Sequence, residues 1–216
     1  SSRTDIHVLY MDGAPAGFRP FDRLGDLVEV YAQLLSALAA AGVEWVQLDE
    51  PAYVCDRSPQ EYDALRATYQ YLGGLTRRPQ LFVATYFGDP GDALAALLAT
   101  PVEAIGLDLV AAPTIVDRLV ESGPLPGRTI VAGLVDGRNV WRTDLRQAVA
   151  TATTLRGLAD HVTVSSSCSL LHVPVDLAAE TGIDPALASR LAFARQKVDE
   201  VVRLATALRT DEASLP

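Results

Sequence analysis

The residues that build disulfide scaffolds and metal centres are scarce in this chain. Only two cysteines, Cys55 and Cys168, and three histidines occur among its 216 residues. Two cysteines so far apart in a chain of ordinary size indicate a reducing compartment rather than a disulfide framework. No apolar run approaches the ~20 residues of a membrane helix, and the first residues lack the apolar core of a signal peptide. A cytoplasmic location is therefore expected.

Positive charge is also in short supply. The chain has 18 Lys and Arg against 27 Asp and Glu, a net charge of −9, and Lys197 as its only lysine. An acidic surface of this kind repels nucleic acids and anionic lipids, so neither is an expected partner. The segment 88–91 contains two glycines but lacks the lysine of a phosphate-binding loop. The hydrophobic content of 49% excludes long disorder.

Several short, mostly apolar runs are present instead. The most informative is 43–52, which ends in two adjacent carboxylates, Asp49 and Glu50, followed by Pro51. Such a run indicates a strand buried on both faces, as in a parallel sheet, and Pro51 ends it because proline lacks the donor that a strand needs. Further strands are expected at 81–84, 104–108, 129–135 and 161–164, with a doubtful one at 6–11.

Helical patterns alternate with these runs. Apolar residues recur at helical spacing from Leu24 to Leu38, and Gly42 follows the last turn. The segment 58–61 predicts a helix start, because it reads as a capping box with proline at the first helical position. Further helices are expected at about 90–100, 113–121 and 143–156. One long helix is expected to open at Asp184-Pro185, with Leu187, Leu191, Ala194, Val198, Val201 and Ala205 on one face.

This alternation predicts an α/β fold of the (β/α)8 TIM-barrel type. Five clear strands and a doubtful sixth fall short of eight, so the chain is expected to form a partial barrel of about five or six parallel βα units. An open arc of this kind leaves two unpaired edges. No Ser- or Gly-rich linker interrupts the chain, which predicts a single domain over 1–216 with a frayed tail at 210–216.

Polar residues follow the strands where ligand groups gather in barrels and open α/β sheets. Carboxylates from several strands, an arginine and a thiol could bind a polar metabolite or a metal there. The competing interpretation is that these side chains only cap helices and satisfy loop backbone. The candidate strand-end pocket comprises Asp49, Glu50, Thr85, Tyr86, Asp108, Asp136, Arg138, Asn139, Ser167, Cys168 and His172.

A catalytic zinc ion needs about three protein ligands, and only Cys168 and His172 lie close together in the sequence. No metal site is therefore expected in this chain. Cys168 could act as a nucleophile with His172, but a buried and inert cysteine is the favoured interpretation. Arg138 with Asp136 could clamp an anion, with a simple ion pair as the alternative.

Four stretches, at 46–52, 84–87, 133–142 and 165–172, together resemble cobalamin-independent methionine synthase, in the right order and spacing. The resemblance is to the latter part of the N-terminal barrel of that family. It runs from about Phe21 to Arg209, whereas residues 1–20 match less well.

The resemblance implies a methyltransferase of two (β/α)8 barrels, which moves a methyl group from a 5-methyltetrahydrofolate polyglutamate to homocysteine and makes methionine. In that family the zinc and the homocysteine pocket belong to the C-terminal barrel, and early segments of the N-terminal barrel help to hold the glutamate tail of the folate. Both regions are absent from this sequence. The implied partners are the missing parts of its own barrel and the C-terminal catalytic barrel.

The motifs of the catalytic barrel can be matched to this chain only in part. Asp49 matches an aspartate that contacts substrate there, and Asp108 roughly matches the zinc glutamate. Cys168 matches the last zinc cysteine, but 85–87 has no ligand in place of a His-x-Cys pair, and Arg138 replaces the proton-donor histidine. Without the charge of a metal to lower the pKa of the homocysteine thiol, this half cannot perform the reaction. A non-catalytic scaffold is therefore expected, with a small-molecule binding or catalytic module at the acidic strand ends as the alternative.

Overall fold

A computed structural model of the chain describes residue 17 and residues 19–210. The doubtful strand at 6–11 and nearly all of the expected tail at 210–216 lie outside these residues. The strands are β1 (Trp45–Asp49), β2 (Gln80–Ala84), β3 (Ala104–Asp108), β4 (Leu125–Val135) and β5 (Ala159–Ser166). The helices are α1 (Leu24–Ala40), α2 (Pro59–Gly73), α3 (Asp92–Leu98), α4 (Ile115–Ser122), α5 (Leu145–Arg156), α6 (Pro185–Ala188) and α7 (Ala194–Thr210). Short 3-10 helices occur at Pro20–Arg23, Pro51–Val54, Leu170–His172 and Leu177–Ala179.

The five strands form one sheet in the order β1-β2-β3-β4-β5, which is also their order along the chain. β1 runs parallel to β2, and β4 runs parallel to β5. This sequential order is typical of a barrel wall, and the sheet is not closed in the described part of the chain. The predicted α/β partial barrel is therefore confirmed.

The chain divides into two compact units. Unit 1 comprises Ser1–Thr85 and Pro90–Ile105, and unit 2 comprises Tyr86–Asp89 and Gly106–Pro216. Of the eleven residues of the predicted strand-end pocket, three belong to unit 1 and eight to unit 2.

Unit 1 contains α1, β1, α2, β2 and α3. The predicted capping box at the start of α2 is confirmed: the Glu61 backbone N–H donates to Ser58 Oγ at 3.3 Å, and the Ser58 N–H donates to Glu61 Oε2 at 2.8 Å. The core of the unit contains Leu48 from β1, Leu81 from β2 and Leu97 from α3, all nearly inaccessible to solvent. β2 is largely buried, as expected of a parallel sheet. The prediction that the run at 43–52 is buried on both faces is wrong, because β1 ends the sheet of the described residues: only Leu48 of this strand is buried, and Trp45 is 45% exposed.

A charged pair joins the two chain segments that flank β2 and β3. The Arg78 guanidinium donates to both carboxylate oxygens of Glu103, at 2.8 and 2.9 Å, and to the Gly73 carbonyl. Glu103 Oε2 also accepts a hydrogen bond from the Leu81 N–H at 2.8 Å. Burial acts to raise the pKa of Glu103, but these hydrogen bonds outweigh it and hold the pKa below its usual value.

The substitution Glu103→Gln is expected to lower the free energy of unfolding at pH 7 by about 1–3 kcal/mol, because a charged acceptor is lost. The pKa of Glu103 is depressed by folding, so its stabilisation is present above its unfolded pKa and is lost as the pH falls. Urea unfolding should therefore show a wild-type advantage that shrinks between pH 7 and pH 3. Asp63→Asn, in an exposed ion pair with Arg66, is the control and should have little effect. An advantage that grows on acidification would contradict the assignment.

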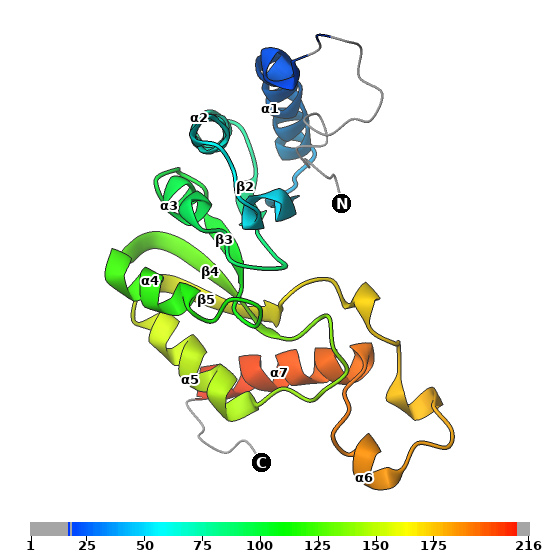
Figure 1. The fold of residues 1–216 in the computed structure, drawn as a ribbon. Helices are drawn as coiled ribbons and strands as arrows, with labels where there is room; N and C mark the ends of the chain where they lie inside the picture. The colour runs from blue at the N-terminus through cyan, green and yellow to red at the C-terminus, as the bar shows by residue number, and fades with distance from the viewer. Residues whose placement is uncertain (1–16, 18, 211–216) are drawn as a thin grey trace. The chain divides into compact units, whose positions relative to one another are not determined.

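Unit 2 contains the end of β3 with α4, β4, α5, β5, α6 and α7. Ile130 of β4 and Leu155 of α5 are fully buried, and so are Leu119 of α4 and Leu204 of α7. α5 and α7 lie side by side (Figure 1). β4 begins at Leu125 and is longer than the predicted strand, because Leu125 already pairs with Ala159 of β5.

The prediction of one long helix from Asp184-Pro185 is wrong. Asp184 caps a helix as expected, through hydrogen bonds from Ala186 N–H and Leu187 N–H, but this helix ends at Ala188. The chain then extends and pairs with the loop after β4: Ala192 N–H donates to Val140 O at 2.8 Å. These tertiary hydrogen bonds outcompete helix continuation.

The apolar face predicted for this helix is wrong at Leu187 and Val198, although Leu191 is buried as predicted. Val198 is 50% exposed, whereas Lys197 is fully buried and Glu200 nearly so. Lys197 Nζ donates to the Trp141 carbonyl at 3.0 Å, and Glu200 Oε1 accepts from the Thr143 N–H at 3.2 Å. Burial lowers the pKa of Lys197. α7 therefore uses charged side chains to satisfy the backbone of the loop after β4.

Candidate functional site

Asp49 and Glu50 close β1 in unit 1, and Thr85 follows β2. Glu50 continues the strand pairing, because its N–H donates to Ala84 O at 2.8 Å. Its side chain turns into the unit and is 5% exposed, with Oε1 accepting a 2.6 Å hydrogen bond from the Tyr69 hydroxyl. Burial and the charge of Glu50 raise the pKa of Tyr69, which keeps that hydroxyl protonated as a donor.

The other two unit 1 residues are similarly engaged. Asp49 Oδ1 accepts from Gln47 Nε2 at 2.7 Å. Thr85 is buried. The carboxylates of unit 1 are thus bound to neighbouring side chains of the same unit, which favours the structural interpretation for Glu50 above all.

The other eight predicted residues belong to unit 2. Asp108 ends β3 and is fully buried. Its Oδ1 accepts from the N–H groups of Val110 and Ala111, at 3.2 and 2.8 Å, and its Oδ2 accepts from the Phe87 N–H at 3.1 Å. Burial raises the pKa of Asp108 despite these hydrogen bonds. Both carboxylate oxygens of Asp108 therefore accept hydrogen bonds from backbone N–H groups of the same chain.

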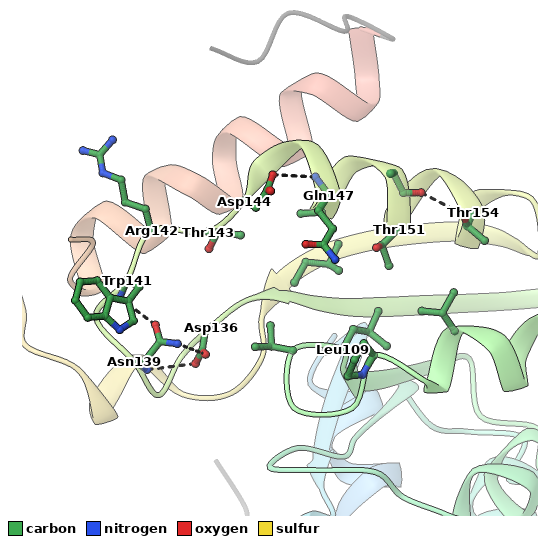
Figure 2. A pocket seen from close by; sticks show the side chains of 16 residues that line it. Leu109, Asp136, Asn139, Trp141, Arg142, Thr143, Asp144, Gln147, Thr151 and Thr154 are labelled. Carbon is green, nitrogen blue, oxygen red and sulfur yellow. Dashed lines mark hydrogen bonds between the residues drawn. The ribbon is translucent and has the colours of Figure 1, made fainter. Parts of the chain in front are cut away.

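Asp136 organises the turn after β4 (Figure 2). Its Oδ1 accepts from the N–H groups of Arg138 and Asn139, at 2.7 and 3.2 Å, and its Oδ2 accepts from the Asn139 side-chain amide. Asn139 Oδ1 in turn accepts from the Trp141 N–H at 3.0 Å. These contacts are those of a side chain that fixes a turn, and they direct Arg138 outward as an exposed residue.

Ser167 and Cys168 follow β5 and pack against the same turn. Ser167 Oγ accepts from the Gly137 N–H at 3.2 Å. A Cβ on Gly137 would lie 2.6 Å from the Cys168 carbonyl oxygen and 2.9 Å from Sγ, so only glycine fits. Burial raises the pKa of the Cys168 thiol, and the charges of Asp108 and Asp136 act in the same direction. The thiol is therefore protonated at neutral pH, which is typical of an inert cysteine.

Phe87 belongs to this group, although sequence reasoning missed it. Its φ of 79° is unusual for a bulky residue. Its ring lies edge-on to Tyr86, with centroids 4.8 Å apart, and edge-on to exposed His172 at 5.6 Å. The Arg138 guanidinium carbon stands 5.4 Å from the Phe87 ring centroid. We call this group the unit 2 mouth; it comprises Tyr86, Phe87, Asp108, Asp136, Arg138, Asn139, Ser167, Cys168 and His172. It combines aromatic rings and one guanidinium with carboxylates that already accept hydrogen bonds.

No signal in the sequence marks Phe87, because only the fold gives its backbone a partner in Asp108. A backbone strained to positive φ at a strand end is often found at functional sites. Among residues 17 and 19–210, no group of three His, Cys, Asp or Glu side chains is placed to hold a metal ion.

A pocket of about 530 Å³ overlaps the mouth at the turn after β4 (Figure 2). Of the predicted residues, it includes Asp136 and Asn139. Leu109, Leu134 and Ala148 form apolar parts of its lining, and polar side chains such as Gln147 and Thr151 lie along α5. Its lining therefore combines an apolar part with polar groups of the turn after β4 and of α5.

A family model described as "Cobalamin-independent synthase, N-terminal domain" matches residues 8–160. The chain is 54% identical to a Streptomyces coelicolor protein over 197 residues, which cover 91% of this chain and 26% of that protein. It is 57% identical to a Mycobacterium tuberculosis protein over 200 residues, which cover 92% of this chain and 26% of that protein. Both relatives are named 5-methyltetrahydropteroyltriglutamate–homocysteine methyltransferase. The chain thus spans about a quarter of the length of these curated relatives.

Proposed function

We propose a function from the premise that this chain belongs to the cobalamin-independent synthase family, as a part of its N-terminal domain. The chain is a non-catalytic scaffold of a methyltransferase that moves a methyl group from 5-methyltetrahydropteroyltriglutamate to homocysteine and makes methionine. Identity above 50% to methyltransferases of that name, sustained over nine-tenths of the chain, is the observation that carries this proposal.

The contacts of the unit 2 mouth support a scaffold rather than a reaction centre. Asp108 and Asp136 accept hydrogen bonds from their own loops, and the Cys168 thiol is protonated. Arg138 stands where the catalytic barrel of the family has a histidine. These residues do not fit the zinc ion that the family implies, because no group of three His, Cys, Asp or Glu side chains among the described residues is placed to hold a metal ion, and we propose that the ion is bound outside this chain.

The remaining partners and the compartment follow from the same premise. β1 and β5 end the sheet of the described residues, and we propose that other strands of the same barrel cover them, with the catalytic barrel beyond. No helix of the described residues is long and apolar enough to cross a membrane. Free Cys55, which is exposed, and free Cys168 agree with a reducing cytoplasm.

A chimera tests this function. The 197 matched residues of the Streptomyces coelicolor methyltransferase would be replaced by the corresponding part of this chain. The chimera should transfer the methyl group to homocysteine with kcat within about tenfold of the parent enzyme, because the catalytic barrel is untouched and unit cores tolerate related sequences.

Two outcomes would contradict the proposal. A folded chimera without methyl transfer would show that this chain cannot serve as the scaffold. Turnover by the 216-residue chain alone would show that the acidic strand ends form a catalytic module instead. A deletion of the same residues from the parent enzyme is the control and should be inactive.

A further inference from the structure

We propose that a second pocket of unit 2, between α5 and α7, binds a free α-amino acid through both its ammonium and its carboxylate group. This pocket has a volume of about 500 Å³. It is lined by residues 142–146, around the start of α5, and by Gln196, Asp199, Glu200 and Arg203 of α7. No residue of the unit 2 mouth takes part in it, so the inference goes beyond the proposed function and does not depend on it.

The charges of this α5–α7 pocket are balanced. Its lining carries three arginines and three carboxylates, which are Arg142, Arg146, Arg203, Asp144, Asp199 and Glu200. Within residues 17 and 19–210, no ion pair joins any two of these six side chains. A pocket that presents both signs in equal number is complementary to a ligand that also carries both, rather than to a simple anion or cation.

Glu200 is the buried carboxylate of the pocket, with only 8% of its surface exposed. Its Oε1 accepts the Thr143 N–H at 3.2 Å, but its Oε2 has no hydrogen-bond partner among the described residues, and neither has the buried Thr143 hydroxyl. The only lysine, Lys197, donates to the Trp141 carbonyl instead and forms no ion pair with Glu200 in this part of the chain.

A buried polar atom without a partner costs free energy, and a charged one costs more. An ammonium group has three N–H donors. One ammonium group can therefore donate to Glu200 Oε2 and to Thr143 Oγ1 together, and its positive charge offsets that of the buried carboxylate. These two orphaned oxygen atoms point to the cationic end of the ligand.

Arg146 of α5 and Arg203 of α7 supply the donors for the anionic end. Both residues are exposed, and neither side chain has a hydrogen bond or an ion pair within the described ranges. The planar fork of a guanidinium matches the two oxygen atoms of a carboxylate. The pocket thus presents carboxylate-binding donors from both of its helices.

An α-amino acid is the smallest common metabolite that carries an ammonium group and a carboxylate on one carbon. A simple carboxylate or a phosphate would leave Glu200 Oε2 without a donor, and an amine would leave the two arginines without an acceptor. Part of the pocket is also fixed in advance, because Asp144 Oδ1 accepts the N–H groups of Arg146 and Gln147 at the start of α5. Groups that are fixed before binding lose less conformational entropy when a ligand arrives.

The test is isothermal titration calorimetry of the 216-residue chain with L-alanine. L-Alanine should bind to one site per chain. Propionate lacks the ammonium group and L-alaninamide lacks the carboxylate, so each should bind at least about tenfold more weakly through the loss of charge-assisted hydrogen bonds. Glu200→Gln, and separately the double variant Arg146→Gln/Arg203→Gln, should each weaken L-alanine binding by about tenfold or more. Arg209→Gln, an exposed arginine of α7 outside the pocket, is the matched control and should bind L-alanine as the wild type does.

Each result supports or overturns the proposal. No binding of L-alanine, or equal binding of propionate or L-alaninamide, would overturn it. L-Alanine binding that the double arginine variant leaves unchanged would place the amino acid elsewhere and would overturn it too. These two arginines are exposed and have no partner in the described part of the chain, so this variant decides the question even if Glu200→Gln does not fold. An inactive chimera would overturn the proposed function alone, because the titration involves no methyl transfer.

Discussion

Replacing Gly133 with alanine is expected to lower the free energy of unfolding of unit 2 by about 3 kcal/mol or more, which exceeds the usual cost of an added methylene. Gly133 lies in β4, opposite Ser165 of β5. A Cβ there would lie 2.7 Å from the Leu107 carbonyl oxygen and 2.7 Å from the Ser167 Cα. All of these atoms belong to backbone, so none can move aside as a flexible side chain would.

The measurement is urea unfolding, followed by hydrogen exchange of the β4 and β5 amides. Gly25→Ala is the matched control, because Gly25 lies in α1 with no atom within 4 Å of the added Cβ. That control should be neutral or stabilising by up to about 1 kcal/mol. Failure of Gly133→Ala to yield folded protein agrees with the expectation. A variant within about 0.5 kcal/mol of wild type would contradict it.

The elements with strong local signals were predictable. The capping box at Ser58 and Glu61 starts α2 as expected, because its hydrogen bonds involve only neighbours in sequence. The positions of the strands were predictable from apolar runs, but the burial of β1 was not, because this strand ends the sheet of the described residues and keeps Trp45 exposed. The close backbone approach at Gly133 was not predicted, although glycine inside a strand often has that meaning.

The wrong predictions concern features that distant residues decide. The helix that begins at Asp184 ends early because the following residues pair with the loop after β4, as shown by Arg142 N–H donating to Arg190 O. Lys197 can be buried because its ammonium group donates a hydrogen bond to the Trp141 carbonyl. A periodicity argument assigns charged residues to the exposed face and cannot anticipate such a need.

The candidate site was predicted by position but not by role. Strand-end reasoning found Asp108, Asp136 and Arg138, because parallel strands carry their ligand groups at the carboxyl ends. It could not decide that the two aspartates accept hydrogen bonds from loop N–H groups while the Arg138 guanidinium contacts the Phe87 ring. These different roles depend on the geometry of the loops, which the spacing of residues along the sequence does not determine.

Asp108→Ala is the second substitution with a large expected effect, a loss of about 3 kcal/mol or more in the free energy of unfolding at pH 7. It removes the acceptor of three N–H groups, those of Phe87, Val110 and Ala111. Each buried donor left without a partner costs about 1–3 kcal/mol. Asp108→Asn is the matched variant: its amide oxygen can keep two of the bonds, and it should lose only about 1 kcal/mol.

The pH dependence separates the charge of Asp108 from its hydrogen bonds. Burial raises the pKa of Asp108 in the folded state above its ordinary value. The folded state therefore binds a proton more readily than the unfolded state, and the contribution of this group to stability decreases as the pH rises through the folded pKa. The difference in unfolding free energy between wild type and Asp108→Asn should accordingly favour wild type more at pH 4 than at pH 7, because the other titrating groups are common to both proteins.

A difference that favours wild type more at pH 7 would mean that the three N–H groups stabilise the carboxylate more than burial destabilises it. Asp108 would then be a charged acceptor built into the mouth, and the raised pKa would be refuted.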